Sequence, residues 1–274
     1  MDLKLRGAVV LITGGSRGIG FALARAFAAE GARLAICARD ATRLEAAAHS
    51  LRMAGASCLA LRADLFDPAD CARVVNETVA AYGRLDVLVN NASTNVDRVP
   101  RSLEEATDAQ VTERFQGKTM AAIRCARAAL PHLRAAGAGR IVNIGGMAAR
   151  SVQRGAERPS AGSGLAQGLG NASLAAFSKY LAEEVAADGI VVNIVHPSLT
   201  RTDRHAGRVA ARAAARNVSV ADIEAEFAAH VPIGRIVEPE DIAPLVLLLA
   251  SPLAGAITGQ AIAVDGGAGR AVQY

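Results

Sequence analysis

The sequence predicts an α/β protein in which one doubly wound, seven-stranded parallel sheet is covered by helices on both faces. Three observations carry this prediction. Short, almost continuously apolar segments alternate with longer segments of helical periodicity, a glycine-rich turn joins the first two, and no linker rich in proline or serine divides the 274 residues. Such strands are typical of parallel sheets buried on both faces, and right-handed crossovers give the doubly wound order.

The apolar segments predict strands at residues 8–12, 33–37, 57–61, 87–89, 140–144, 190–195 and 261–264. Apolar residues at helical spacing, such as Ile19, Leu23 and Phe27 after the first strand, mark the intervening helices. These helices are predicted at residues 18–29, 41–54, 68–82, 103–134, 170–187, 220–230 and 239–249. With 51% apolar residues the chain can bury a large core, and we expect residues 1–274 to form a single domain.

The turn after the first strand reads TGGSRGIG, with glycine at positions 14, 18 and 20. Glycine permits a tight turn, lets the backbone approach a pyrophosphate and leaves room where the helix meets the strand. The helix N-terminus adds unpaired N–H groups and the positive end of its dipole. The turn therefore predicts a dinucleotide site, whose expected contacts are Gly14, Ser16, Arg17, Gly18, Ile19 and Gly20.

The charge pattern argues against a nucleic-acid-binding protein. The net charge is +4, but the 30 lysines and arginines are scattered and aromatic residues make up only 3%. A mildly basic surface suits an anionic cofactor or substrate. Four cysteines without C-x-x-C spacing are expected to be reduced. The N-terminal residues lack an apolar signal region and no apolar run reaches ~20 residues, so we expect a cytoplasmic protein without a membrane span.

Five motifs follow one another along the chain: TGGSRGIG, Asn90-Asn91-Ala92, RIVNIGG, VVNIVHPSLTRTD and TGQAIAVDGG. Their order and spacing resemble the short-chain dehydrogenase/reductase family over residues 5–267. The resemblance implies a Rossmann-like fold, an oxidoreductase with a nicotinamide cofactor, and a dimer or tetramer built through the helices at 103–134 and 170–187. It also implies further cofactor contacts, at Asp64, Leu65, Asn91, Ala92, Pro197, Thr200 and Thr202.

The end of the second predicted strand indicates which cofactor is bound. Dinucleotide sites often carry there an acidic residue that grips the ribose hydroxyls and repels a 2′-phosphate. This chain has Ala38 followed by Arg39, and Arg17 lies in the glycine turn. Two guanidinium groups can meet a 2′-phosphate, which predicts NADP(H) in preference to NAD(H). The alternative is that Arg39 is merely solvated, with Asp40 as its neighbour.

The resemblance implies catalytic Asn, Ser, Tyr and Lys, and the spacing places these positions at Lys118, Gly146, Gln167 and Asn171. All four residue types are changed, and lysine and asparagine have exchanged places. The tyrosines at positions 82, 180 and 274 do not fall at the required position. Lys118 could act as an acid or stabilise an oxyanion or enolate; alternatively it extends from a helix surface into water.

Two further segments and one histidine are also considered for roles in the site. The segment 146–170 carries Arg150, Arg154 and Arg158 and could be a loop that receives a carboxylate or phosphate of the substrate, or simply a solvated loop. Residues 204–231 match the family's substrate-covering helices. His196 is interpreted as a structural, hydrogen-bonded histidine rather than a catalytic one.

The leading hypothesis is an NADP(H)-dependent reductase of an activated C=C, carbonyl or imine group in a small organic molecule, with atypical acid catalysis and no metal. Two alternatives remain at this stage. One is a redox-neutral enzyme for hydrolysis or C–C cleavage on the same scaffold. The other is a non-catalytic dinucleotide-binding protein, which would bind the cofactor without turnover.

Overall fold

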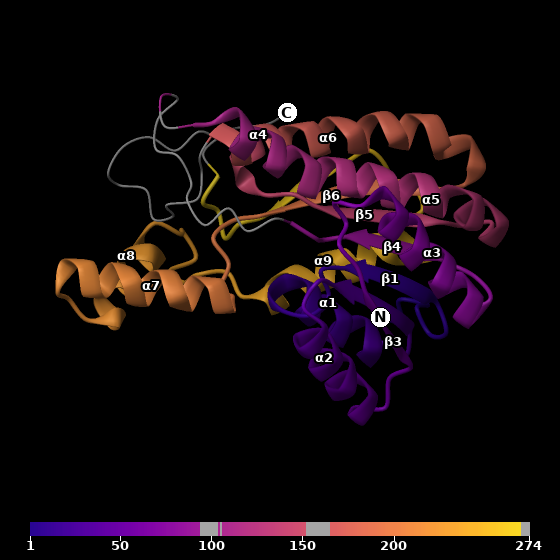
Figure 1. Cartoon of the computed structure of the whole chain (residues 1–274), viewed down its shortest axis with the longest axis horizontal. Helices are drawn as coiled ribbons and strands as arrows, with labels where there is room; N and C mark the ends of the chain where they lie inside the picture. The colour runs from indigo at the N-terminus through magenta and orange to yellow at the C-terminus, as the bar shows by residue number, and fades with distance from the viewer. Residues whose placement is uncertain (94–103, 105, 152–164, 270–274) are drawn as a thin grey trace.

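Seven parallel strands form one sheet in the order β3-β2-β1-β4-β5-β6-β7, with helices on both faces (Figure 1). The computed structural model describes residues 1–93, 104, 106–151 and 165–269. The doubly wound, seven-stranded prediction is confirmed. Strand order reverses between β1 and β4, and in such sheets ligands bind outside the carboxyl ends of the strands at this switch point.

The strands are β1 Val9–Thr13, β2 Arg33–Ala38, β3 Cys58–Arg62, β4 Val87–Asn90, β5 Arg140–Ile144, β6 Val191–Pro197 and β7 Ala261–Val264. The α-helices are α1 Gly18–Ala29, α2 Ala41–Met53, α3 Pro68–Tyr82, α4 Asp108–Phe115, α5 Ala121–Ala136, α6 Leu165–Val185, α7 Asp203–Arg216, α8 Val220–Ala229 and α9 Pro239–Ala250. The described residues also form one π-helical turn, η1 Gln116–Met120, and three 3₁₀ turns, η2 Met147–Ala149, η3 Ala186–Asp188 and η4 Pro252–Ala254.

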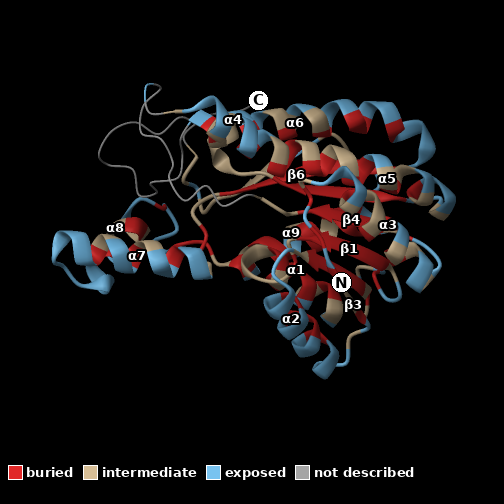
Figure 2. Ribbon diagram, in the orientation of Figure 1, coloured by how far each residue is buried: buried red, intermediate tan, exposed pale blue. Residues whose placement is uncertain are grey.

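Two apolar layers lie on opposite faces of the sheet, visible as buried positions in Figure 2. Alternate residues of β1 supply both layers: Val10 and Ile12 pack with Leu23 and Phe27 of α1, while Leu11 faces the layer of α3, α5 and α6. Because both faces are covered, the strands are apolar nearly throughout. All four cysteines are buried and free, as expected for reduced thiols.

The largest correction concerns the predicted helix at 103–134. In the structure α4 begins at Asp108 behind a capping box, in which Thr107 and Gln110 bond each other's backbone N–H. A π-helical turn, η1, then separates α4 from α5. Residues 103 and 105 lie outside the described chain. Such turns insert a residue into the helical ladder and occur often at functional sites, and this one carries Lys118.

Both ends of α6 also differ from the prediction, and the ends of several strands and helices shift by one or two residues. Helix α6 begins at Leu165 rather than residue 170, so Gln167 is helical, and it ends at Val185, where a 3₁₀ turn leads to Gly189 in the left-handed conformation. The glycines at 168 and 170 obscured this start, because glycine is a weak helix former. The region 204–231 contains α7 and α8, which share a small apolar cluster. None of the described helices combines the length and apolar content that crossing a bilayer requires.

Candidate active site

The glycine turn between β1 and α1 is packed so closely that side chains are excluded. A Cβ on Gly20 would lie 2.3 Å from the Gly14 carbonyl oxygen and 2.4 Å from Asn91 Nδ2. Gly14 has a positive φ of 67°. Asn91 Nδ2 donates to the carbonyl oxygens of Thr13 at 3.0 Å and of Gly14 at 3.1 Å. Asn91 therefore supports the turn that was predicted to hold the pyrophosphate.

Thr13 supports the candidate site, and the sequence reasoning did not single it out. Its Oγ1 accepts hydrogen bonds from the backbone N–H groups of Asn91 and Ala92, both at 3.0 Å, and donates to the Val89 carbonyl oxygen at 3.3 Å. These bonds join the ends of β1 and β4 at the switch point. The only signal in the sequence is the threonine that precedes the first glycine of the turn.

The N-terminus of α1 suits an anionic ligand. Its N-cap residue, Arg17, is extended and no side chain caps the helix. Ser16 and Ile19 are half-buried beside it. Thr202 lies against the turn, since a Cβ on Gly18 would be 3.2 Å from Thr202 Cγ2. An uncapped helix start beneath a close-packed glycine turn fits the pyrophosphate of a dinucleotide.

Neither of the two arginines predicted to bind phosphate, Arg17 and Arg39, pairs with the neighbouring acidic residue Asp40 in the described structure. Asp40 caps α2: it accepts from Arg43 N at 3.0 Å and pairs with the Arg43 guanidinium at 3.7 Å. Arg39 is exposed and Arg17 half-buried, and among the described residues neither side chain makes a hydrogen bond or ion pair. Both guanidinium groups can therefore take a ligand.

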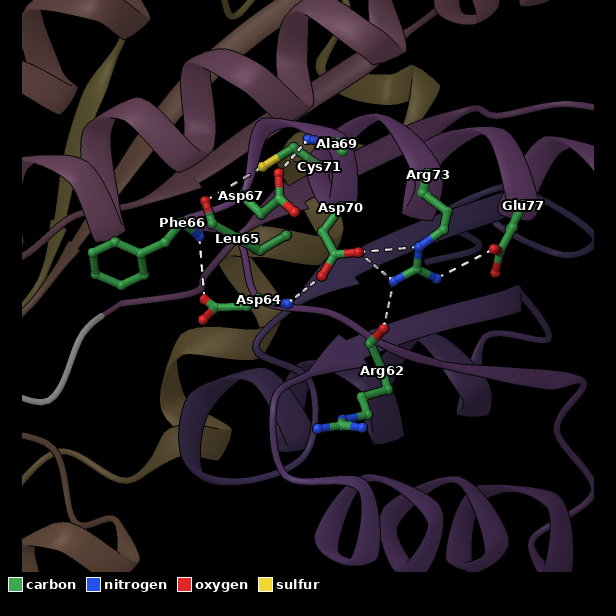
Figure 3. A network of polar contacts seen from close by, with 10 residues as sticks. All are labelled: Arg62, Asp64, Leu65, Phe66, Asp67, Ala69, Asp70, Cys71, Arg73 and Glu77. Carbon is green, nitrogen blue, oxygen red and sulfur yellow. Dashed lines mark hydrogen bonds and ion pairs between the residues drawn. The ribbon is translucent and has the colours of Figure 1, made fainter.

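A polar network fixes the loop after β3 (Figure 3). The Asp70 carboxylate accepts from Asp64 N at 2.7 Å and pairs with Arg73 at 2.6 Å, and Arg73 also donates to the Arg62 carbonyl oxygen at 2.7 Å. The hydrogen bond from Asp64 N and the pairing with Arg73 lower the pKa of Asp70. Asp64 stays exposed, and its carboxylate accepts from Phe66 N at 3.2 Å. Leu65 is buried beside it.

The segment after β6 is held to its neighbours. Pro197 is buried in the strand, and Thr200 Oγ1 donates to the Ser198 carbonyl oxygen at 3.0 Å. Ser198 Oγ donates to the Asp265 carbonyl oxygen at 3.2 Å. Thr202 is the N-cap residue of α7, yet its side chain makes no capping bond. Its side chain contacts the glycine turn through Cγ2, and the family resemblance implies that Thr202 binds the nicotinamide.

Lys118 is buried, with 6% of its surface exposed. Its Nζ donates to the Gly145 carbonyl oxygen at 2.9 Å. Asn171 on α6 is 1% exposed, and a Cβ on Gly146 would lie 2.9 Å from Asn171 Nδ2. Three of the four predicted catalytic positions thus meet at the end of β5. Gln167 lies four residues before Asn171 on α6 and is half-buried.

Burial determines the charge states of Lys118 and His196. Burial, together with the smaller effect of the positive charges of Arg114 and Arg204, lowers the pKa of Lys118 to about 7. Burial also lowers the pKa of His196 to about 4, so this imidazole is neutral. Burial at 6% exposure is incompatible with a lysine that extends into water from a helix surface.

Polar atoms of Asn171 suit a bound ligand. Within the described part of the chain, neither Nδ2 nor Oδ1 has a hydrogen-bond partner, although both are buried. Buried polar groups are nearly always paired. Of the three loop arginines, Arg150 donates to the Ala261 carbonyl oxygen at 3.1 Å, whereas Arg154 and Arg158 lie outside the described residues.

Comparisons with known proteins show the family to which the chain belongs. The family model described as enoyl-(acyl carrier protein) reductase matches residues 14–269. Cis-4-hydroxycyclohexanecarboxylate dehydrogenase from Sinomonas cyclohexanicum is 34% identical over 259 residues, which cover 94% of this chain and 95% of the relative. The 3-oxoacyl-[acyl-carrier-protein] reductase of Escherichia coli is 32% identical and covers 97% and 98%.

Solved structures are similarly close. L-sorbose reductase from Gluconobacter frateurii, complexed with NADPH and L-sorbose, superposes with a TM-score of 0.91 at 33% identity and covers 99% of this chain and 100% of that one. An actinorhodin polyketide ketoreductase with NADPH gives a TM-score of 0.86 at 30% identity, with 97% and 98% covered. The chain belongs to the short-chain dehydrogenase/reductase family, and it is an enzyme of that oxidoreductase class.

Proposed function

We propose that this protein is an NADP(H)-dependent reductase in which the Lys118 ammonium replaces the phenol that the family resemblance implies. The observation that carries the proposal is a buried lysine beside Gly146 and Asn171, at the switch-point edge of the sheet. No described tyrosine is available there: Tyr82 belongs to α3, and Tyr180 is 79% exposed on α6. Tyr274 lies outside the described residues.

The cofactor would be held by this chain's own groups. The open N-terminus of α1 suits the pyrophosphate, and Arg17 and Arg39 suit a 2′-phosphate. Asp64 and Leu65 would border the adenine, Ala92 and Pro197 the ribose and nicotinamide, and Thr202 the carboxamide. The buried Asn171 amide, which has both a donor and an acceptor to offer, suits a ribose hydroxyl. When bound, the cofactor supplies the hydride.

Lys118 supplies the charge and proton that complete a reduction. With a pKa of about 7, its Nζ can hold a proton or release one at neutral pH. As a cation it stabilises an oxyanion or enolate near the Gly145 loop. Reduction of an activated C=C bond fits best, because an enolate needs a nearby cation and solvent can complete its protonation. Carbonyl and imine groups are the other candidate acceptors.

The electrostatics around Lys118 favour an anionic substrate. Arg114 and Arg204 lie near enough for their positive charge to lower the pKa of Lys118. A carboxylate or phosphate on the substrate would offset this repulsion. The cyclohexanecarboxylate in the name of one relative is of this chemical type. We also propose that α7 and α8 cover the substrate, and that the protein works in the cytoplasm as a homo-oligomer.

The experiment has two stages. Calorimetric titration should show micromolar binding of NADPH and much weaker binding of NADH, with Arg39→Ala reducing that difference. C4-deuterated NADPH is then supplied with unsaturated, keto and imino acids. Stereospecific deuterium in the product would support the reductase.

Two outcomes contradict the proposal. Turnover that is indifferent to nicotinamide would favour a redox-neutral enzyme. NADPH binding without oxidation in the presence of every acceptor would favour a non-catalytic dinucleotide-binding protein.

Lys118→Met should abolish turnover and leave NADPH affinity within about a factor of three, since the lysine would act on the substrate rather than the phosphates.

A further inference from the structure

One peptide unit in the candidate site is held from both of its polar ends. The Gly145 carbonyl oxygen accepts from Lys118 Nζ at 2.9 Å, and the N–H of the same peptide, on Gly146, lies 3.1 Å from His196 Nδ1. His196 is fully buried on β6, and Lys118 comes from the π-helical turn. Two elements far apart in sequence therefore meet through a single amide.

Two hydrogen bonds between His196 and Gly146 are possible, one for each tautomer of the neutral ring. Its Nδ1 is 3.1 Å from both the nitrogen and the oxygen of Gly146. The Gly146 oxygen already accepts from Ala149 N at 3.1 Å, and Gly145 N donates to the Val195 oxygen at 2.7 Å. The Gly146 N–H has one proton to give and His196 Nδ1 beside it. Pairing this N–H requires Nδ1 to be the acceptor, which places the proton of the neutral ring on Nε2, an atom without a hydrogen-bond partner within the described residues.

The geometry also disfavours larger residues at this loop. A Cβ on Gly145 would lie 2.5 Å from His196 Nδ1, and one on Gly146 would lie 2.9 Å from Asn171 Nδ2. The pair Gly145-Gly146 is thus matched to His196 on one side and Asn171 on the other. Any side chain at position 145 would displace the imidazole from the amide.

We propose that His196 is a positioning residue for Lys118, acting through the Gly145–Gly146 peptide unit. When Nδ1 accepts from the N–H, it polarises the amide and makes the Gly145 oxygen a stronger acceptor for the ammonium. His196 so favours the charged form of Lys118 and fixes where its proton is held. The inference rests on the proposed role of Lys118 in the reaction.

The surrounding charges act in the opposite direction. Arg114 from α4 and Arg204 from α7 disfavour the Lys118 ammonium, and Arg150 and Lys118 disfavour a charged His196. Asn171, which faces the same loop from α6, carries no charge. Within the described residues, the hydrogen bond from Nζ to the Gly145 carbonyl oxygen favours the Lys118 ammonium.

The test measures the pKa of Lys118 by NMR, which is practical because the chain has few lysines. Lys4, Lys118 and Lys179 are the three lysines of the chain, so protein labelled with ¹³C-lysine gives three side-chain Cε signals, and Lys118→Met assigns the one of interest. In His196→Leu the acceptor is lost, and the pKa of Lys118 should fall by about one unit. In His196→Asn the amide oxygen sits where Nδ1 was, and the pKa should stay near that of the unmutated protein.

An unchanged Lys118 titration in folded His196→Leu would overturn the proposal, as would an equal fall in both variants. A second measurement needs no variant at this site: in ¹⁵N-histidine-labelled protein, His196 should show a protonated Nε2 and an unprotonated Nδ1 at pH 7. The opposite tautomer would refute the mechanism even if neither variant folds.

Both measurements are made without turnover. They can therefore succeed in a protein that oxidises no NADPH, which would refute the proposed reductase and leave the coupling intact. Conversely, normal reduction with an unaltered lysine titration would refute only the coupling. If the protein is a reductase, activity of His196→Leu at pH 7 should fall roughly five-fold, the change in charged Lys118 that one pKa unit produces.

Discussion

Lys118 shows how much one buried residue can reveal about a site. A lysine loses hydration when it is buried, and the loss disfavours its charged form. Within the described residues, Lys118 makes one hydrogen bond, to the Gly145 oxygen, and the charges of Arg114 and Arg204 oppose its own. Stability is therefore sacrificed at this point, as is common for groups that bind or react.

The same burial predicts a pH dependence of stability. The pKa of Lys118 falls from 10.5 to about 7 on folding, so between these values the unfolded chain binds more protons than the folded one. The free energy of unfolding should therefore rise with pH across that window, by up to about 1.4 kcal/mol per unit, and fall as pH drops toward 7.

Lys118→Met removes this contribution. Urea unfolding at pH 7.5 and 9.5 should show that the stability of the unmutated protein, relative to Lys118→Met, rises by about 2–3 kcal/mol between the two. Comparing two pH values cancels the constant cost of the lost hydrogen bond. Lys179→Met, at an exposed position on α6, is the matched control. Parallel curves for Lys118→Met and the unmutated protein would show that Lys118 is charged in the fold.

At the scale of elements, the junction of β1, α1 and β4 organises the cofactor side. Thr13 and Asn91 tie the strand ends together, and the glycine turn fits between them without space for a Cβ. The packing explains why glycine occurs at position 20, inside a helix, where it otherwise weakens the element.

Gly20→Ala should therefore damage both stability and binding. Its Cβ would overlap the Gly14 oxygen and push α1 away from the turn, with an expected loss of about 1–3 kcal/mol and at least a ten-fold loss of NADPH affinity. Gly207→Ala is the control, because Gly207 lies within α7, is exposed and has open space around its Cα. Thermal denaturation and calorimetry report the two effects. Similar behaviour of the two variants would mean that the turn relaxes freely.

For the whole molecule, exposed apolar side chains on α4 and α6 point to self-association. Phe115 is 38%, Leu169 49% and Tyr180 79% exposed, and the two helices contact each other along one edge of the molecule (Figure 2). Contiguous exposed apolar surface commonly marks an interface. We expect a homo-oligomer formed through this face.

Tyr180→Glu should lower the mass measured by light scattering, because a carboxylate in an apolar contact is costly. Met53→Glu, at a 74% exposed position at the end of α2, should leave the mass unchanged. A monomeric unmutated protein at micromolar concentration would contradict the expected assembly.

The sequence by itself determined the architecture. Short apolar strands alternate with helical periodicity, and glycine at positions 14, 18 and 20 marks the turn, because these signals are local and recur with the geometry of the backbone. The predicted starts of α1 and α3 match the structure for the same reason. Spacing also brought Lys118, Gly146 and Asn171 to one place.

Tertiary structure decided what spacing could not. The π-helical turn at Lys118, the bond of Thr13 to β4 and the amide shared by Lys118 and His196 all depend on contacts between segments distant in the chain. Whether a lysine is solvated or buried depends on every element that surrounds it. Desolvation is a property of the folded molecule, so the charge of Lys118 became evident only once α4, β5, β6 and α6 were in place.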